Sequence, residues 1–273
     1  MSEEILINVT PPETRVAVIE NGVVQEIIIE RSEKLGLVGN IYKGKVSRVL
    51  PGMQAAFIDV GLERTAFLHA SDIYKESETS NINDLLREGE EIIVQVVKDP
   101  LGTKGARLTT NISIPSRYLV FMPNIKTIGV SQKIEDATER ERLKETLTNL
   151  SNESEFNSGF IARTAADSVS ENELKKDIQF LERLWRSICK KSSTIEAKKS
   201  IHEELPLALR ALRDLINNEV EKIKIDSKST YDKAMEFIKN FIPDAESIIE
   251  YYPGEGPIFD LYSVENEIQK AMK

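Results

Sequence analysis

The hydrophobic pattern at the start of the chain is that of short β-strands. Residues 5–9 form an apolar run, and two alternating stretches, 15–20 and 23–30, flank the dipeptide Asn21-Gly22. Both positions of such a dipeptide tolerate positive φ, which makes it the strongest short hairpin signal. The pattern therefore predicts one strand followed by a β-hairpin.

A second set of strands follows between residues 39 and 110. The turns between them are short and rich in proline and glycine, namely Leu50-Pro51-Gly52, Gly61-Leu62-Glu63-Arg64 and Asp99-Pro100-Leu101-Gly102. The polar run from Lys75 to Asn83 is expected to be a surface loop. The predicted strands are 42–49, 54–60, 65–69 and the β-branched segment 91–98. Together they indicate a small antiparallel barrel.

Helices and strands alternate in the rest of the chain. Ser170-Glu171-Asn172-Glu173 is a capping box, and the helix that it opens carries Trp185 on its apolar stripe, where we expect a core residue. The predicted strands are 118–122, 159–164, 219–225 and 247–252, and the predicted helices are 135–150, the one from Ser170, one from Pro206, 229–241 and 260–272. Three antiparallel strands at the start and an α-β-α-β-α tail predict a ribonuclease-H-like α/β domain that is split by inserted segments.

Composition limits the class of protein. The chain has 273 residues, of which 40% are apolar and 30% are charged, as in ordinary globular proteins. The single Cys189 excludes an internal disulfide and a cysteine cluster for zinc. The acidic start Met1-Ser2-Glu3-Glu4 is not typical of a signal peptide, and no apolar run is long enough to span a bilayer. We therefore expect a cytoplasmic protein without a membrane partner.

The net charge of −9 is unusual for a nucleic-acid binder, but the acidic excess lies at the two ends. Residues 1–38 carry 3 basic and 7 acidic side chains, and residues 196–273 carry 11 and 16. Residues 39–110 carry 9 and 10, and residues 111–195 carry 13 and 12. Any contact with nucleic acid should therefore be local and aided by stacking.

Two phenylalanines in the predicted barrel are candidates for such stacking. Phe57 and Phe67 lie on adjacent strands, with Lys43, Lys45 and Arg64 nearby in the sequence. Oligonucleotide-binding barrels present aromatic rings in this way. The alternative is that both rings belong to the core, which is the usual place of a single Phe in a strand.

The same stretch resembles an S1 RNA-binding domain, and its sequence motifs are similar to those of one family. Ala55-Ala56-Phe57-Ile58-Asp59-Val60-Gly61 and Ala66-Phe67-Leu68-His69 resemble the ribonuclease E/G endoribonucleases. Three further blocks, 102–110, 118–124 and 159–164, match the family in order and spacing. The resemblance implies an α+β, multidomain protein: a split ribonuclease-H-like α/β domain (1–38 and 196–273), an inserted S1 (OB-fold) β-barrel (39–110) and an α/β 5′-sensor subdomain (111–195).

The resemblance also implies roles for individual residues. Arg163 and Thr164 match a pair that holds the 5′-monophosphate of RNA, and Val120 matches a backbone contact of the same sensor. Lys104 matches an S1 lysine that meets RNA, whereas Ser116 stands where better-known members carry glycine. On spacing alone, the favoured interpretation of Arg163-Thr164 is a solvated strand end, and that of Lys104, between two glycines, is a loop tip. We interpret His69 and His202 as structural, because neither has metal-ligand spacing.

In this family two aspartates of a following nuclease domain bind Mg²⁺, and a Cys-Pro-x-Cys motif with Zn²⁺ joins protomers of a homo-oligomer. Neither feature occurs in the 273 residues, so we assign no catalytic residue, no metal ligand and no cofactor to this chain. The expected partner is single-stranded RNA with a 5′-monophosphate, bound but not cleaved. Two alternatives are a non-catalytic S1 module of translation or RNA decay, and an assembly role with both phenylalanines buried.

Overall fold

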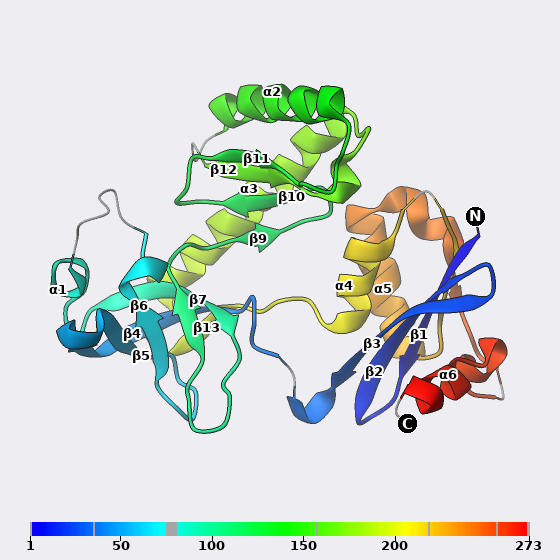
Figure 1. The fold of residues 1–273 in the computed structure, drawn as a ribbon, viewed down its shortest axis with the longest axis horizontal. Coiled ribbons are helices and arrows are strands. Elements are labelled where there is room, and N and C mark those ends of the chain that lie inside the picture. Colours follow the sequence, from blue (N-terminus) through cyan, green and yellow to red (C-terminus); the bar gives the residue numbers. More distant parts are fainter. Residues whose placement is uncertain are drawn as a thin grey trace. The chain divides into compact units, whose positions relative to one another are not determined.

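The computed structural model describes residues 2–34, 36–74, 81–154, 156, 158–217, 219–254 and 256–271. It divides into two compact units (Figure 1). The first unit combines Met1–Leu35 with Leu205–Lys273, and the second is Gly36–Glu204. Each unit is described by itself below.

The first unit is built on a five-stranded sheet in the order β15-β14-β1-β2-β3. Strands β1, β2 and β3 are antiparallel, and β14 and β15 run parallel to β1. Their bounds are Glu3–Val9, Glu13–Glu20, Val23–Arg31, Val220–Ile225 and Ile249–Tyr251. Asn21 and Gly22 turn the β2–β3 hairpin with positive φ of 49° and 80°. Three antiparallel strands followed by two parallel ones confirm the predicted ribonuclease-H-like layout.

Helices and 3₁₀ turns cover both faces of this sheet. Ile5, Ile7 and Val16 point to helices α4 (Leu207–Leu215) and α5 (Lys228–Phe241). Leu6, Ala17 and Ile19 pack on the other face against η6 (Ile258–Tyr262) and α6 (Val264–Ala271), and η5 (Pro243–Ile248) precedes β15. Because β1 is covered on both faces, Ile5, Leu6 and Ile7 are all buried. The final helix begins four residues later than the sequence predicted, since η6 occupies that segment.

The second unit contains a closed barrel of five strands. The strand order is β4-β5-β6-β8-β7, and β4 also pairs with β7. These strands are Ile41–Leu50, Ala55–Asp59, Ala66–His69, Arg107–Thr109 and Glu91–Lys98, joined in part by η2 (Pro51–Met53), η3 (Ala70–Asp72) and α1 (Ile82–Leu85). This is the S1 type of OB-fold barrel that the sequence predicted. Of the predicted loop from Lys75 to Asn83, residues 75–80 lie outside the described residues, and Ile82 is buried at the start of α1.

A four-stranded sheet with two helices follows the barrel within the same unit. Its order is β11-β12-β10-β9, with bounds Ile128–Val130, Gly159–Ala162, Leu119–Met122 and Ile114–Pro115. Helices α2 (Ala137–Glu153) and α3 (Glu171–Thr194) share its buried side, and η4 (Thr164–Ala166) follows β12. Ser170 accepts the N–H of Glu173, so the predicted capping box is present.

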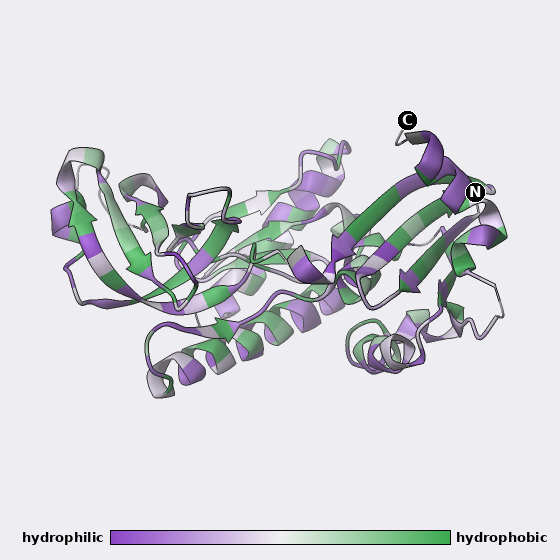
Figure 2. Cartoon of the chain, turned by 90° about the horizontal axis from the view of Figure 1, so that it is seen from below, coloured by the Kyte–Doolittle hydropathy of each residue, from purple (hydrophilic) through white to green (hydrophobic). Residues whose placement is uncertain are grey.

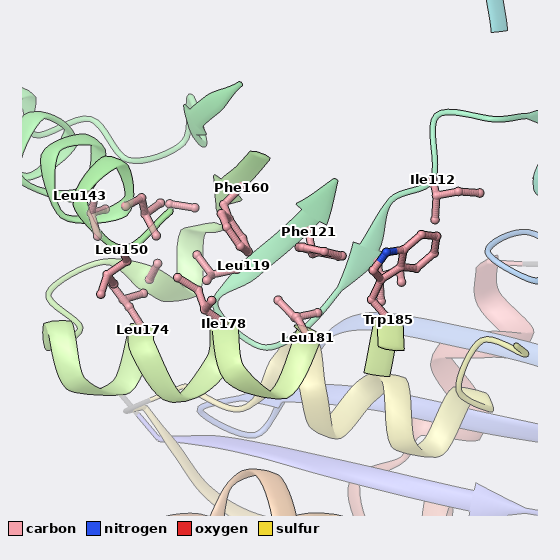
Figure 3. Close-up of a cluster of buried hydrophobic side chains, with 14 of the residues drawn as sticks. Ile112, Leu119, Phe121, Leu143, Leu150, Phe160, Leu174, Ile178, Leu181 and Trp185 are labelled. Atoms are coloured by element: carbon pink, nitrogen blue, oxygen red, sulfur yellow. The ribbon is translucent and has the colours of Figure 1, made fainter. Parts of the chain in front are cut away.

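Aromatic packing forms the centre of this core (Figure 3). The ring of Phe121 lies 5.4 Å from that of Phe160 and 6.3 Å from that of Trp185, and both phenylalanines are fully buried. Trp185 is a core residue, as its place on the apolar stripe of α3 predicted. Figure 2 shows hydrophobic residues alternating with hydrophilic ones along strands and helices, the pattern of elements with one buried side.

One strand comes from a segment that the sequence placed in the ribonuclease-H-like part. Strand β13 (Lys199–His202) pairs antiparallel with β4 and so extends the barrel sheet beyond residue 195. Its Ile201 packs with Ile41 and Trp185 in one core cluster. The second unit accordingly runs to Glu204.

Gly159 at the start of β12 allows a close backbone approach. A Cβ atom there would lie 2.2 Å from the carbonyl oxygen of Ile125 and 2.5 Å from that of Thr127. We expect Gly159→Ala to lower the free energy of unfolding by about 3 kcal/mol, because backbone cannot yield as a side chain does. The matched control is Gly52→Ala, where a Cβ meets nothing within 4 Å; it should change stability by less than about 1 kcal/mol. Urea unfolding of both variants measures the difference, and equal stabilities would contradict the close approach.

Candidate nucleic-acid interface

Phe57 and Phe67 lie on the outer face of the barrel. The residues that alternate with them, Ala56, Ile58 and Leu68 among others, are fully buried, whereas both phenylalanines are partly exposed. They pair directly across β5 and β6, with ring centroids 6.2 Å apart and an angle of 68° between the rings. The alternative that both rings belong to the core is therefore wrong.

Arginines flank the two rings on the neighbouring strands. Arg48 of β4 pairs with Phe57, and Arg107 of β8 pairs with Phe67. Directly paired residues share one face of a sheet, so the outer surface carries the row Arg48, Phe57, Phe67, Arg107. Arg107 also forms an ion pair with Asp72 at 2.8 Å. Sequence reasoning missed both arginines, because the strand register that brings them to the rings is not visible in the sequence.

His69 adds a third ring to this surface. Its imidazole stacks on Phe67 with centroids 6.5 Å apart and a 29° angle. Its Nδ1 also accepts the N–H of Ser71 at 3.1 Å and so caps η3. The structural role predicted for His69 is present, and the same geometry places the ring beside Phe67.

Lys104 is exposed in the loop between β7 and β8. A Cβ at the next residue, Gly105, would lie 2.0 Å from the carbonyl oxygen of Thr65, so only glycine lets this loop approach the start of β6 so closely. The carbonyl of Ala106 accepts the N–H of Phe67 at 2.7 Å. The loop of Lys104 is thus attached to the strand of Phe67.

Of the three cations noted near the rings in the sequence, Lys43 and Arg64 have protein partners, and Lys45 is exposed on β4. Lys43 forms an ion pair with Glu91 at 2.9 Å and donates to the carbonyl of Ile195 at 3.0 Å. Arg64 donates to the carbonyl of Gly102. Among the cations near the rings, Lys45, Arg48 and Lys104 are exposed.

The residues predicted to sense a 5′ end lie on the four-stranded sheet. Val120 pairs with Ile161, and the N–H of Arg163 donates to the carbonyl of Tyr118 at 2.8 Å. Strand alternation therefore puts Val120 and Arg163 on the same face, opposite to the buried Leu119 and Ala162. Thr164 is exposed immediately after Arg163, with its Oγ1 3.5 Å from the Oγ of Ser131.

Ser116 connects this surface to helix α3. The Nη1 of Arg163 donates to the Ser116 carbonyl at 2.5 Å. The Ser116 hydroxyl donates to Oδ2 of Asp177 at 2.5 Å, and the N–H of Tyr118 donates to the same oxygen at 3.2 Å. Burial raises the pKa of Asp177 to about 6, although these hydrogen bonds favour its charged form.

The ribonuclease-H-like unit holds a polar group at the carboxyl ends of its parallel strands. Asp226 accepts the Nδ2 of Asn8 at 2.5 Å and the N–H of Val9 at 2.8 Å. Arg15 donates to the Oδ1 of Asn8 at 2.8 Å. The group therefore joins β2, β1 and β14.

In the described part of the chain, no three His, Cys, Asp or Glu side chains gather as a metal site requires. Within those same residues, none of the helices has the length and apolar character needed to cross a membrane.

The raised pKa of Asp177 has a consequence for stability. The folded state binds this proton more tightly than the unfolded state, whose carboxyl has the ordinary value of 3.8. The stabilising contribution is therefore complete below about pH 4 and is lost as the pH rises through about 6. We expect Asp177→Asn, which cannot ionise, to gain about 1–3 kcal/mol relative to the unchanged protein between about pH 4 and pH 7. Chemical unfolding across this range measures the difference, and parallel pH profiles would contradict it.

Comparison with known proteins agrees with this geometry. A family model described as S1 RNA binding domain matches residues 37–110, and one described as Ribonuclease E/G family matches residues 113–273. The chain is 51% identical to ribonuclease G of Escherichia coli (strain K12) over 284 aligned residues, which cover 100% of the chain and 58% of that protein.

Other relatives give the same result. Ribonuclease G of Haemophilus influenzae is 50% identical over 98% of the chain and 56% of its own length. Ribonuclease E of Escherichia coli (strain K12) is 37% identical over 99% of the chain and 26% of its own length. The chain thus spans little more than half of the ribonuclease G proteins that it matches. With an S1 barrel followed by a family match over most of the remaining residues, the chain belongs to the ribonuclease E/G family.

Proposed function

We propose that residues 1–273 are the RNA-recognition part of a single-strand-specific endoribonuclease of RNA processing and decay. The barrel holds single-stranded RNA, and Arg163 with Thr164 reads a 5′-monophosphate. The observation that carries the proposal is the row of Phe57 and Phe67 between Arg48 and Arg107 on an outer barrel face.

This row suits a flexible single strand. Bases stack on aromatic faces with little sequence preference, and arginines beside them attract the phosphates. His69 extends the stacking surface, and Lys104 adds an exposed cation next to the strand of Phe67. Because such binding is local, it does not require a basic protein, which agrees with the net charge of −9.

The 5′ end is read on the outer face of the four-stranded sheet. The planar guanidinium of Arg163 presents several donors to phosphate oxygens, and the exposed hydroxyl of Thr164 adds another. Val120 lies on the same face of the adjacent strand, where its backbone borders the site. The family resemblance of this segment supports its assignment as the sensor.

Cleavage itself is assigned to residues beyond the part that this chain shares with its relatives. The chain aligns to 58% of the ribonuclease G of Escherichia coli. We place the carboxylates that bind Mg²⁺, and the zinc link that joins protomers, in the remainder. Residues 1–273 alone are then expected to bind single-stranded RNA without cutting it.

Removing either ring tests the barrel surface. We expect Phe57→Ala and Phe67→Ala each to weaken binding of a single-stranded oligonucleotide by about 1–3 kcal/mol, roughly 5- to 150-fold in Kd. Fluorescence anisotropy at fixed salt measures the loss. Phe241→Ala, which removes an exposed ring on the ribonuclease-H-like unit, is the control and should leave affinity unchanged. Unchanged affinity in both barrel variants would refute the proposed interface.

The sensor is tested by comparing two ends of the same oligonucleotide. The unchanged chain should bind the 5′-monophosphorylated form more tightly than the 5′-hydroxyl form, and Arg163→Ala should abolish this preference, a loss of about tenfold for a charge-assisted contact. Arg183→Ala, an exposed cation on α3, controls for loss of charge. Equal affinities for the two ends in the unchanged chain would rule out the sensor.

A further inference from the structure

A buried polar contact lies directly behind Arg163. Asp177 is on α3, between residues whose side chains pack into the hydrophobic core, such as Leu174 and Ile178. Its carboxylate turns to the β9–β10 connection, where it meets the Ser116 hydroxyl and the N–H of Tyr118. Ser116 is itself only 3% exposed.

The contacts run from the helix to the guanidinium through one residue. The Ser116 hydroxyl donates to Asp177, and its oxygen accepts the N–H of Leu119 at 3.3 Å, so its position is fixed from two sides. The Ser116 carbonyl in turn accepts the Nη1 of Arg163. A long arginine side chain has many rotamers, and this bond selects among them.

Core packing does not explain a carboxyl group at this position. Leu174, Ile178 and Leu181 already provide the apolar contacts of α3, and a carboxylate that loses water costs stability unless it is partnered. The rise in the pKa of Asp177 expresses that cost. Costs of this kind are concentrated at functional sites.

The charges that face Asp177 are cationic. Arg117, on the same connection, favours its ionised form, and its guanidinium lies 5.1 Å above the ring of Tyr118. Arg163 stands on the far side of Ser116. On its own helix, Glu173 precedes Asp177 by one turn and bonds to Ser170 at the helix cap. The carboxylate is therefore favoured in its charged form by Arg117 and is linked to Arg163 through Ser116.

We propose that Asp177 is a positioning residue of the 5′-phosphate site, which holds Ser116 and thereby orients the guanidinium of Arg163 toward the phosphate. The proposal rests on the proposed function of Arg163. It assigns to Ser116, where the family resemblance implies glycine, the role of transmitting this constraint through its hydroxyl and its carbonyl.

A double-mutant cycle tests this role in the 273-residue chain. Asp177→Ala and Ser116→Ala should each lower the preference for the 5′-monophosphorylated over the 5′-hydroxyl oligonucleotide, by roughly tenfold if orientation is lost. The double variant should lose no more than either single variant, because both remove the same link. Asp177→Asn should keep most of the preference, because its amide oxygen still accepts from Ser116.

Affinity for the 5′-hydroxyl oligonucleotide is the internal control, because it measures RNA binding by the barrel and should stay unchanged in all variants. A general structural defect would lower it together with the preference. If Asp177→Ala does not fold, Ser116→Ala and Asp177→Asn decide: a full preference in Ser116→Ala overturns the proposal.

Two further outcomes overturn it. If Arg163→Ala loses the preference while Asp177→Ala keeps it, the sensor stands and the positioning role is refuted. If the losses from Asp177→Ala and Ser116→Ala are additive, Asp177 does not act through Ser116. An unchanged chain without any preference refutes the sensor itself, and the positioning role with it.

Discussion

The alternation of side chains along a pleated strand is the constraint on which both candidate sites depend. Once Ala56 and Ile58 face the barrel core, Phe57 between them must face outward. The same rule applies to the four-stranded sheet, where burial of Leu119 turns Val120 to the outer face. A slip of register by one residue would bury the functional side chains and expose the core.

The position of each outer face depends on how the strands pack against the core on their other side. Phe121, Phe160 and Trp185 fix the four-stranded sheet against α3, and the same helix carries Asp177 to the turn that holds Arg163. In the barrel, Gly105 allows the β7–β8 loop to press against β6, which brings Lys104 to the strand of Phe67. In both the barrel and the four-stranded sheet, the same strands therefore pack the core with one face and present the candidate RNA-binding residues on the other.

The sequence was most informative for features that depend only on residues close together in the chain. Asn21-Gly22 and the capping box at Ser170 depend on a few neighbouring residues, and both are present as predicted. Phe57 and Phe67 could be paired because their strands are consecutive. Arg48 and Arg107 could not be found, because their position beside the rings follows from register and from a parallel pairing between β6 and β8.

Short strands and contacts between residues far apart in the chain could not be predicted from local sequence patterns. Strand β13 has four residues, too few to show a period of two, and it joins β4 from more than 150 positions away. Asp177 looks like a solvated residue on an amphipathic helix until its contact with Ser116 is seen, 61 positions earlier in the chain. Its meaning depends on the serine, because a glycine there has no hydroxyl for the carboxylate to accept from. Ser116 in place of glycine and the carboxylate of Asp177 on α3 therefore form one feature. The serine hydroxyl binds the carboxylate and fixes the turn, and the carbonyl of the same residue orients the guanidinium of Arg163.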